Sequence, residues 1–277
     1  MIGEADVVEE TDEKPRNRYS APALSKGLDI IELLAQQTVG LKKSEIAAAL
    51  GRSISEIFRM LAVLEERGYV MLDPASERYS LTMRLFELAH RHPPTRRLTR
   101  VAAEVMEDFA QETNQSVHLA ILHGAHILVI AQTDPPGNNI TSVRLGARVP
   151  VVLTASGAVL ASQLDPARRT ALLERLPEAT PETIAKFEEN LRQFAREGYC
   201  ESPSLVIAGI QNISVPIHSH EGEIIAALTV PHVTRLIPGD DPDLATCRER
   251  LIAAGHLISR RLGAGAALTD AGAPPAG

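Results

Sequence analysis

The residues with the clearest capacity for chemistry lie on one side of a predicted helix, residues 53–67. At about 100° per residue, that side gathers a mostly polar set: Arg52, Ser55, Glu56, Arg59 and Val63. Arginine can bind guanine or phosphate through two hydrogen bonds, and glutamate can accept one from cytosine. The pattern favours contact with DNA, and Arg59 is the strongest candidate because it lies one turn into the helix.

Glu56 has a second interpretation, which we weigh equally with DNA contact. Ser53 and Glu56 form an S-x-x-E capping box, in which the glutamate reaches back to the backbone at the start of the helix. The opposite side of the helix is apolar and is expected to face the core: Ile54, Ile57, Phe58, Leu61 and Leu64.

The neighbouring segments predict a winged helix-turn-helix around this helix. A helix over residues 23–37 comes first, and a short one that starts at the N-cap Ser44 ends at the Gly51 turn. Two strand-like runs, 69–72 and 78–81, flank a turn. In this arrangement the second helix of the motif enters the major groove. The remaining predicted DNA contacts lie before that helix, at its start and in the hairpin: Lys42, Lys43, Ser44, Ser53, Arg78 and Tyr79.

The charge distribution fits contact between DNA and the N-terminal half only. The whole chain of 277 residues has a net charge of −7. Residues 1–13 carry six acids and no base, residues 14–100 carry 15 Lys and Arg against 9 Asp and Glu, and residues 101–277 carry 13 against 20. Positive charge is therefore concentrated around the predicted helix-turn-helix, where it can attract phosphate.

The rest of the chain predicts a second, α+β domain. A helix over 83–92 is expected to continue the core through Leu85, Phe86, Leu88 and Ala89, and it stops at Pro93-Pro94. A new helix over 98–111 carries a buried stripe and ends at Asn114. Strands are expected at 116–122, 127–133, 141–145, 210–217 and 224–230, and helices at 155–164, 165–176, 181–197 and 242–262. We divide the chain into an arm (1–19), a DNA-binding domain (20–83), a linker (84–97), a second domain (98–263) and a loose tail (264–277). The arm carries Lys14, Arg16 and Arg18, which either touch DNA or are simply solvated.

No pattern for catalysis, metal or cofactor binding stands out. The nucleophile-elbow, dinucleotide, P-loop and H-E-x-x-H motifs are absent, and His218, His220 and Glu221 lack further recognisable ligands. Cys200 and Cys247 make neither a disulfide framework nor a zinc cluster. No apolar run is long enough to span a bilayer and the N-terminus is acidic, so we expect a cytoplasmic protein that needs no membrane.

Ordered motifs over residues 23–263 make the chain resemble the IclR family of bacterial transcriptional regulators. In the first half they are A-L-S-K-G-L-D-I-I-E-L-L-A from Ala23, S-E-I-A-A-A-L-G from Ser44, S-x-x-x-R-M-L-A-V-L-E-E-R-G-Y-V from Ser55 and R-Y-S-L from Arg78. In the second half they are L-G-A-R-V-P from Leu145, T-A-S-G-A-V-L-A from Thr154, E-G-Y from Glu197, S-V-P-I from Ser214 and E-G-E-I-I-A-A-L-T-V from Glu221.

The resemblance implies a winged helix-turn-helix, a linker helix and a GAF-like effector-binding domain. It also implies a homodimer or dimer of dimers that binds a palindromic operator in double-stranded DNA and a small organic effector. Position by position, the implied effector-binding residues are Thr154, Ala155, Ser156, Gly157, Ser202, Asn212, Thr229 and Pro231.

The chain departs from the family pattern after G-Y, where Ser202-Pro203-Ser204-Leu205 replaces an acidic run. Asn212 stands where cysteine is common, and Pro231 where serine is common. We therefore expect a larger, partly apolar or aromatic effector rather than a small keto acid. Residues 202–205 are alternatively only a lid loop. The resulting hypothesis is a repressor of a catabolic operon; an activator of the same fold and, more distantly, a small-molecule-binding enzyme are the alternatives.

Overall fold

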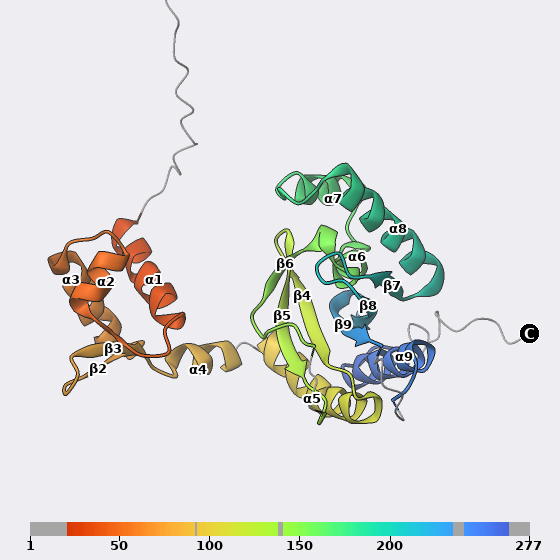
Figure 1. The fold of residues 1–277 in the computed structure, drawn as a ribbon, viewed down its shortest axis with the longest axis horizontal. Helices are drawn as coiled ribbons and strands as arrows, with labels where there is room; N and C mark the ends of the chain where they lie inside the picture. Colours follow the sequence, from red (N-terminus) through yellow and green to blue (C-terminus); the bar gives the residue numbers. More distant parts are fainter. Residues whose placement is uncertain (1–20, 92, 138–140, 235–240, 266–277) are drawn as a thin grey trace, which may run out of the picture. The chain divides into compact units, whose positions relative to one another are not determined.

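The computed structural model describes residues 21–91, 93–137, 141–234 and 241–265, and it forms two compact units that meet in sequence at Arg91 and His92. Figure 1 labels their elements. The predicted arm and nearly all of the predicted tail lie outside the described residues. Within the described part, no helix is long and apolar enough to cross a membrane.

The first unit is the predicted winged helix-turn-helix. It contains α1 (Pro22–Ala35), β1 (Leu41–Lys42), α2 (Lys43–Ala49), α3 (Ile54–Glu66), β2 (Val70–Asp73) and β3 (Arg78–Leu81). The three strands pair antiparallel in the order β1-β3-β2, and the β2–β3 hairpin is the wing. Its turn is held by the Asp73 carboxylate, which accepts hydrogen bonds from the Ala75 N–H at 3.1 Å and the Ser76 hydroxyl at 2.5 Å.

The core of this unit is narrower than the apolar pattern of α3 predicts. Ile57 and Leu61 are fully buried and Leu64 packs at the edge of the core. Ile54 and Phe58, which we expected in the core, are 53% and 52% exposed. Residues one turn apart share a side of the helix, but α1, α2 and the sheet cover only the stripe through Ile57 and Leu61. The neighbouring apolar residues on that side therefore stay exposed.

The helix after the wing, α4 (Arg84–Arg91), does not bury its apolar residues in the first unit. Leu85, Phe86 and Leu88 are exposed, and the expectation that they extend the core is wrong. The next helix, α5 (Pro93–Thr113), begins five residues earlier than predicted, because proline fits the first turn of a helix as well as it ends one. Asn114 follows with a positive φ of 52°, as expected for a helix end.

The second unit is built on a six-stranded antiparallel sheet in the order β6-β5-β4-β9-β8-β7. The strands are β4 (Val117–His123), β5 (His126–Thr133), β6 (Arg148–Pro150), β7 (Cys200–Pro203), β8 (Ile210–His218) and β9 (Ile224–Val233). The 3-10 turn η1 (Val151–Leu153) leads into α6 (Ala155–Ala161), and α7 (Pro166–Leu173), α8 (Pro181–Glu197) and α9 (Leu244–Arg261) complete the unit.

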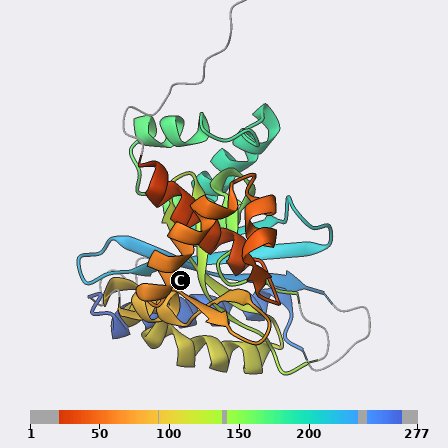
Figure 2. The same cartoon turned by 90° about the vertical axis from the view of Figure 1, so that its left-hand side faces the viewer.

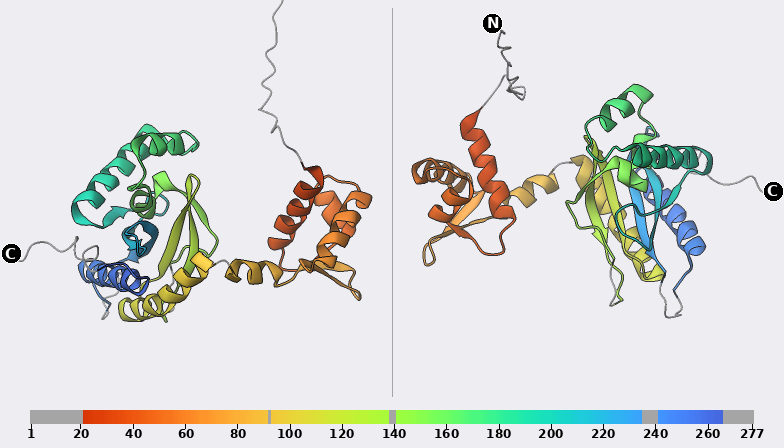
Figure 3. Two further views of the ribbon diagram at one scale, coloured as in Figure 1. Left: turned by 180° about the vertical axis from the view of Figure 1, so that it is seen from behind. Right: turned by 45° about the horizontal axis from the view of Figure 1, so that its top comes forward.

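Helices cover both faces of this sheet, which makes three layers (Figures 1 and 3). On one face, α5 and α9 pack over a core that includes Leu119, Val215 and Leu228. On the other face, α6 and α8 pack over Ala120, Cys200 and Ala227. The same layering is visible in Figure 2, where α5 and α9 lie below the sheet and α7 and α8 above it. Alternate residues of each strand thus serve different layers.

One predicted strand does not form, and two strands of the second unit were not predicted. Residues 141–145 form no strand; Gly146 and Ala147 hydrogen-bond with Val129 of β5, and the paired strand begins at β6. The sequence pattern missed β6 and β7, because R-V-P and C-E-S-P are not apolar runs.

Candidate DNA-binding surface and effector pocket

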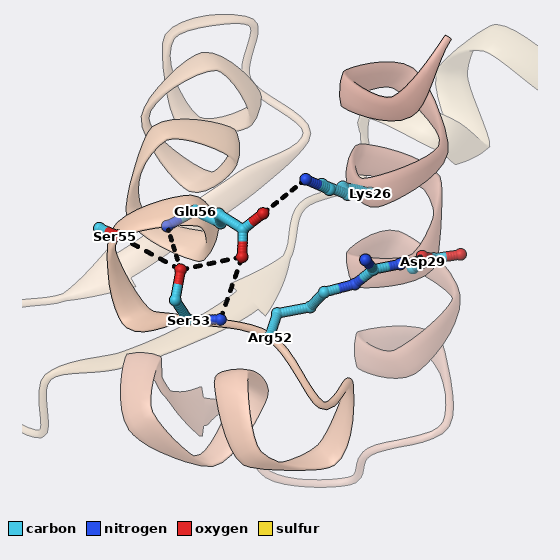
Figure 4. Close-up of polar contacts among 6 residues, drawn as sticks. All are labelled: Lys26, Asp29, Arg52, Ser53, Ser55 and Glu56. Atoms are coloured by element: carbon cyan, nitrogen blue, oxygen red, sulfur yellow. Dashed lines mark hydrogen bonds and ion pairs between the residues drawn. The ribbon is translucent and has the colours of Figure 1, made fainter. Parts of the chain in front are cut away.

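The start of α3 is fixed by the predicted capping box (Figure 4). The Ser53 hydroxyl accepts a hydrogen bond from the Glu56 N–H at 3.4 Å and donates one to Glu56 Oε2 at 2.9 Å. Glu56 Oε2 also accepts from the Ser53 N–H at 3.2 Å, and Glu56 Oε1 accepts from Lys26 Nζ at 2.6 Å. These contacts, with the Lys26 hydrogen bond the largest, lower the pKa of Glu56 from 4.5 to about 2.

Both oxygens of Glu56 are therefore engaged within the unit. Of its two predicted roles, the structure supports the cap, and we withdraw Glu56 as a reader of cytosine. Arg52 forms a longer ion pair, of 3.8 Å, with Asp29, which lies three residues after Lys26 on α1 (Figure 4). Ser55 lies 3.3 Å from Ser53 through their hydroxyl oxygens and is exposed.

The wing strand β3 contributes less to an outer surface than expected. Tyr79 is only 6% exposed and belongs to the core of the first unit, which argues against its predicted contact with DNA. Burial also raises the pKa of its phenol. Arg78 donates to the Gly40 carbonyl at 2.6 Å and to Glu45 Oε2 at 2.9 Å, which ties its guanidinium to the neighbouring strand and helix.

The remaining predicted DNA contacts stay exposed, apart from the partly buried Lys43. Arg59 has no hydrogen bond or ion pair to any described residue. Lys43 Nζ lies 4.9 Å from the centroid of the Phe58 ring, and Lys42 Nζ is 3.9 Å from Glu77. Ser44, predicted as an N-cap, is the second residue of α2, because Lys42 occupies the cap and its N–H bonds to Glu45 at 2.8 Å. The outward side of α3 thus combines one unpaired arginine with apolar Ile54 and Phe58.

The second unit contains a cavity of about 310 Å³ between the sheet, the start of α6 and two loops. Six of the eight residues predicted to bind the effector line it: Thr154, Ala155, Ser156, Asn212, Thr229 and Pro231. Most other lining residues are apolar and come from β5, the segment before α6, the loop after β7 and the start of β8. They include Ile127, Val143, Val149, Leu153, Val206, Ile207 and Ile210. Ser204 also lines it, so part of the predicted lid lies at the cavity.

The other two predicted residues, Gly157 and Ser202, do not line the cavity. Gly157 donates its N–H to the Thr154 hydroxyl at 2.9 Å, and a side chain there would collide with the Val151 carbonyl 2.1 Å away. Ser202 is buried, and its hydroxyl accepts a 3.4 Å hydrogen bond from Asn190 of α8. Both residues hold the wall in place instead of forming its surface.

Two polar residues of the lining were missed from the sequence. Arg144 is the only charged residue among the described ones that line the cavity. His118 on β4 is 4% exposed, and burial lowers its pKa to about 4. Its burial could have been noticed, because it lies between Val117 and Leu119 in an apolar run typical of a buried strand.

The cysteines and the His220–Glu221 pair show no arrangement for catalysis or metal binding in the described part of the chain. Burial raises the pKa of Cys200 to about 12 and that of Cys247 to about 11, so both thiols stay protonated at neutral pH. Among the described residues no three His, Cys, Asp or Glu side chains group as metal ligands. His220 and Glu221 form only an exposed contact of 3.7 Å.

A winged helix-turn-helix joined to a second domain that contains a cavity is the architecture of a DNA-binding transcriptional regulator. Comparison with known proteins identifies which kind. Residues 94–260 match the family model of the bacterial transcriptional regulator IclR C-terminal domain, and residues 23–74 match that of the IclR helix-turn-helix domain. The chain belongs to the IclR family of transcriptional regulators.

Similar proteins share nearly the whole chain. The HTH-type transcriptional regulator XynR of Escherichia coli K12 is 32% identical, and the alignment covers 87% of this chain and 97% of XynR. The glycerol operon regulatory protein of Streptomyces coelicolor is 29% identical, over 88% and 97% of the two chains. Among solved structures, an IclR homologue from Microbacterium hydrocarbonoxydans in complex with 4-hydroxybenzoate is 26% identical over 87% and 98%, with a TM-score of 0.72.

Proposed function

We propose that this regulator is a repressor of a catabolic operon, and that a small organic acid with an apolar body releases it from its operator. The cavity of the second unit carries the effector part of this proposal. Its volume lies at the small end of the roughly 300–1,000 Å³ range of ligand sites, which suits a single ring or a short chain. An apolar wall with Arg144 and no described carboxylate favours a ligand that is apolar over most of its surface and negatively charged at one end.

The complex of the Microbacterium hydrocarbonoxydans homologue with 4-hydroxybenzoate supports the same class of effector, because an aromatic acid has this chemistry. The N–H groups of Ala155 and Ser156 at the start of α6 are a further anchor for a carboxylate. Thr154, Asn212, Thr229 and Pro231 complete the proposed set. Gly157 and Ser202 are proposed to position it.

The proposed DNA surface is the outward side of α3 with Lys42 and Lys43 at the start of α2. Arg59 reads a base, since its guanidinium is exposed and unpaired among the described residues. Lys42, Lys43, Ser44 and Ser55 contact the phosphates that flank it. Arg52 and Arg78 add positive charge, although each is paired with an acid, and Ser53 caps the helix.

We also propose that the protein is a homodimer or a dimer of dimers on a palindromic operator. Support comes from two exposed apolar rows in the first unit. Leu24 and Leu28, one turn apart on α1, are 63% and 48% exposed, and Leu85 and Leu88, three residues apart on α4, are 36% and 37% exposed. A second copy would bury such rows.

The test is a titration of labelled promoter duplex at fixed salt, with and without candidate acids. The parent should prefer its own promoter to random duplex, and an active acid should weaken that binding. Arg59→Ala should lose about 1–3 kcal/mol of operator affinity if Arg59 contacts a base. Arg175→Ala, which removes an exposed arginine from the second unit, is the charge-matched control.

Two further results would complete this test. Ser156→Trp should abolish the response to the acid and leave operator binding intact, because the indole would fill the cavity. Deletion of the gene should raise transcription of the adjacent operon, whereas an activator would lower it. Equal affinity for promoter and random duplex, with and without acids, would refute the proposed function.

A further inference from the structure

His118 is an unusual residue in the wall of the cavity. It is 4% exposed, and its Nδ1 atom is fully buried with no hydrogen-bond partner. Neither ring nitrogen bonds to another described residue. A buried polar group without a partner costs roughly 1–3 kcal/mol, so natural proteins rarely keep one that serves no purpose.

The neighbours of His118 in the sheet form no hydrogen bond with its ring. On one side His118 is paired with Thr229 of β9, whose hydroxyl bonds to that of Ser214 at 2.8 Å. On the other side it is paired with Gln132 of β5, whose Nε2 donates to Asp134 and to Ser142, each at 2.9 Å. The His118 ring itself lines the cavity.

We propose that His118 is the specificity-determining residue of the cavity, and that it selects an effector with a neutral hydroxyl group at the end opposite its carboxylate. This inference rests on the proposed effector function and makes it more specific. The carboxylate end is drawn to Arg144, the charged residue on the 141–147 loop. The hydroxyl end reaches His118 on the sheet.

The protonation state of His118 supports a neutral partner. Burial keeps its pKa near 4, so at neutral pH the imidazole carries no charge and offers one donor and one acceptor. A hydroxyl matches both. A carboxylate placed there would be buried without a counter-charge, which is far more costly.

The experiment compares two matched pairs of acids: 4-hydroxybenzoate with benzoate, and 6-hydroxyhexanoate with hexanoate. Their dissociation constants are measured by calorimetry on the full-length parent and on variants. The parent should bind the hydroxylated member of at least one pair about tenfold more tightly. His118→Leu should reduce that ratio to within about twofold, because leucine can form no hydrogen bond.

Two variants serve as controls. His232→Leu removes another buried histidine with an unpartnered ring nitrogen, but His232 does not line the cavity, so the ratio should not change. Arg144→Gln should weaken both members of a pair by a similar factor and preserve the ratio. Without ligand, His118→Leu should unfold at a temperature no lower than the parent, whereas loss of a purely structural histidine would lower it.

The outcomes separate this inference from the proposed function. If the parent binds none of the four acids, the proposed effector class is wrong and the role of His118 falls with it. If acids bind and release operator DNA, but the ratio is near one in the parent or persists in His118→Leu, only the inference is overturned.

Discussion

Replacement of Gly157 by alanine should disable the effector cavity although this residue does not line it. The added Cβ would lie 2.1 Å from the Val151 carbonyl oxygen and 2.7 Å from Thr154 Oγ1. Ordinary contact begins at 3.4 Å, so the carbonyl would have to retreat by 3.4 − 2.1 = 1.3 Å. The obstacle is backbone, which cannot rotate away as a flexible side chain can.

The cost follows from two effects. Overpacking of a tight core costs about 1–3 kcal/mol. Displacement of Thr154 also weakens the cap of α6, worth about 1 kcal/mol, because its hydroxyl accepts the Gly157 N–H at 2.9 Å. At about 2–4 °C per kcal/mol for a domain of this size, the unfolding midpoint of the second unit should fall by roughly 4–16 °C.

The assay pairs thermal unfolding with the operator titration in the presence of an active acid. Gly157→Ala should bind operator like the parent and lose most of its response to the acid, since the wall at Thr154 to Ser156 has moved. Gly27→Ala is the matched control: no atom lies within 4 Å of its added Cβ, and in α1 it should stabilise by up to about 1 kcal/mol. Parental stability and a parental response in Gly157→Ala would refute this reasoning.

Three further predictions concern the first unit. Tyr79→Phe should leave operator affinity unchanged in the titration, because the ring is buried; a loss above about 1 kcal/mol would restore its DNA role. Glu56→Gln should lower the free energy of unfolding of the first unit in urea above pH 4.5. The difference from the parent should vanish as pH falls toward 2, because Glu56 of the parent becomes protonated near its lowered pKa. A difference that does not change with pH would contradict this. If Phe58 touches the methyl group of a thymine, replacing that thymine by uracil should weaken operator binding by the parent by about 0.8 kcal/mol in the operator titration. The same replacement should leave operator binding by Phe58→Ala unchanged.

Local signals predicted most of the first unit from the sequence. Ser53 and Glu56 at the right spacing determine where α3 begins, and both partners of the cap lie within four residues. Ion pairs across longer distances were not predictable in this way. Lys26 is thirty residues from Glu56, and only the packing of α1 against α3 brings them to 2.6 Å. That contact decided between the two roles of Glu56.

Apolar periodicity has a similar limit in α3 and α4. It shows which residues can share a side, but the width of the covering surface decides how many are buried. Ile57 is covered and Phe58 is not, although both are large and apolar. Exposed Leu85 and Leu88 show the same for α4.

The cavity depended on strand register, which a single sequence does not specify. The pairing of His118 with Thr229 joins strands far apart in the chain, and β7 becomes a strand only because β8 and α8 lie beside it. Pro150 would ordinarily argue against a strand. It is tolerated in β6 because that strand is at the edge of the sheet.

Two of the residues considered for binding have side chains that lack a hydrogen-bond partner within the described structure. Three other candidates for binding form hydrogen bonds with neighbours within their own unit: Glu56, Arg78 and Thr229. Arg59 and His118 do not. Arg59 is exposed, so water can replace a protein partner and the missing hydrogen bond costs little. Its lack of a partner allows contact with DNA but does not by itself indicate it. For buried His118 the missing hydrogen bond destabilises the ligand-free protein, and a ligand hydroxyl would supply that bond. The lack of a partner is therefore stronger evidence for a binding role at His118 than at Arg59.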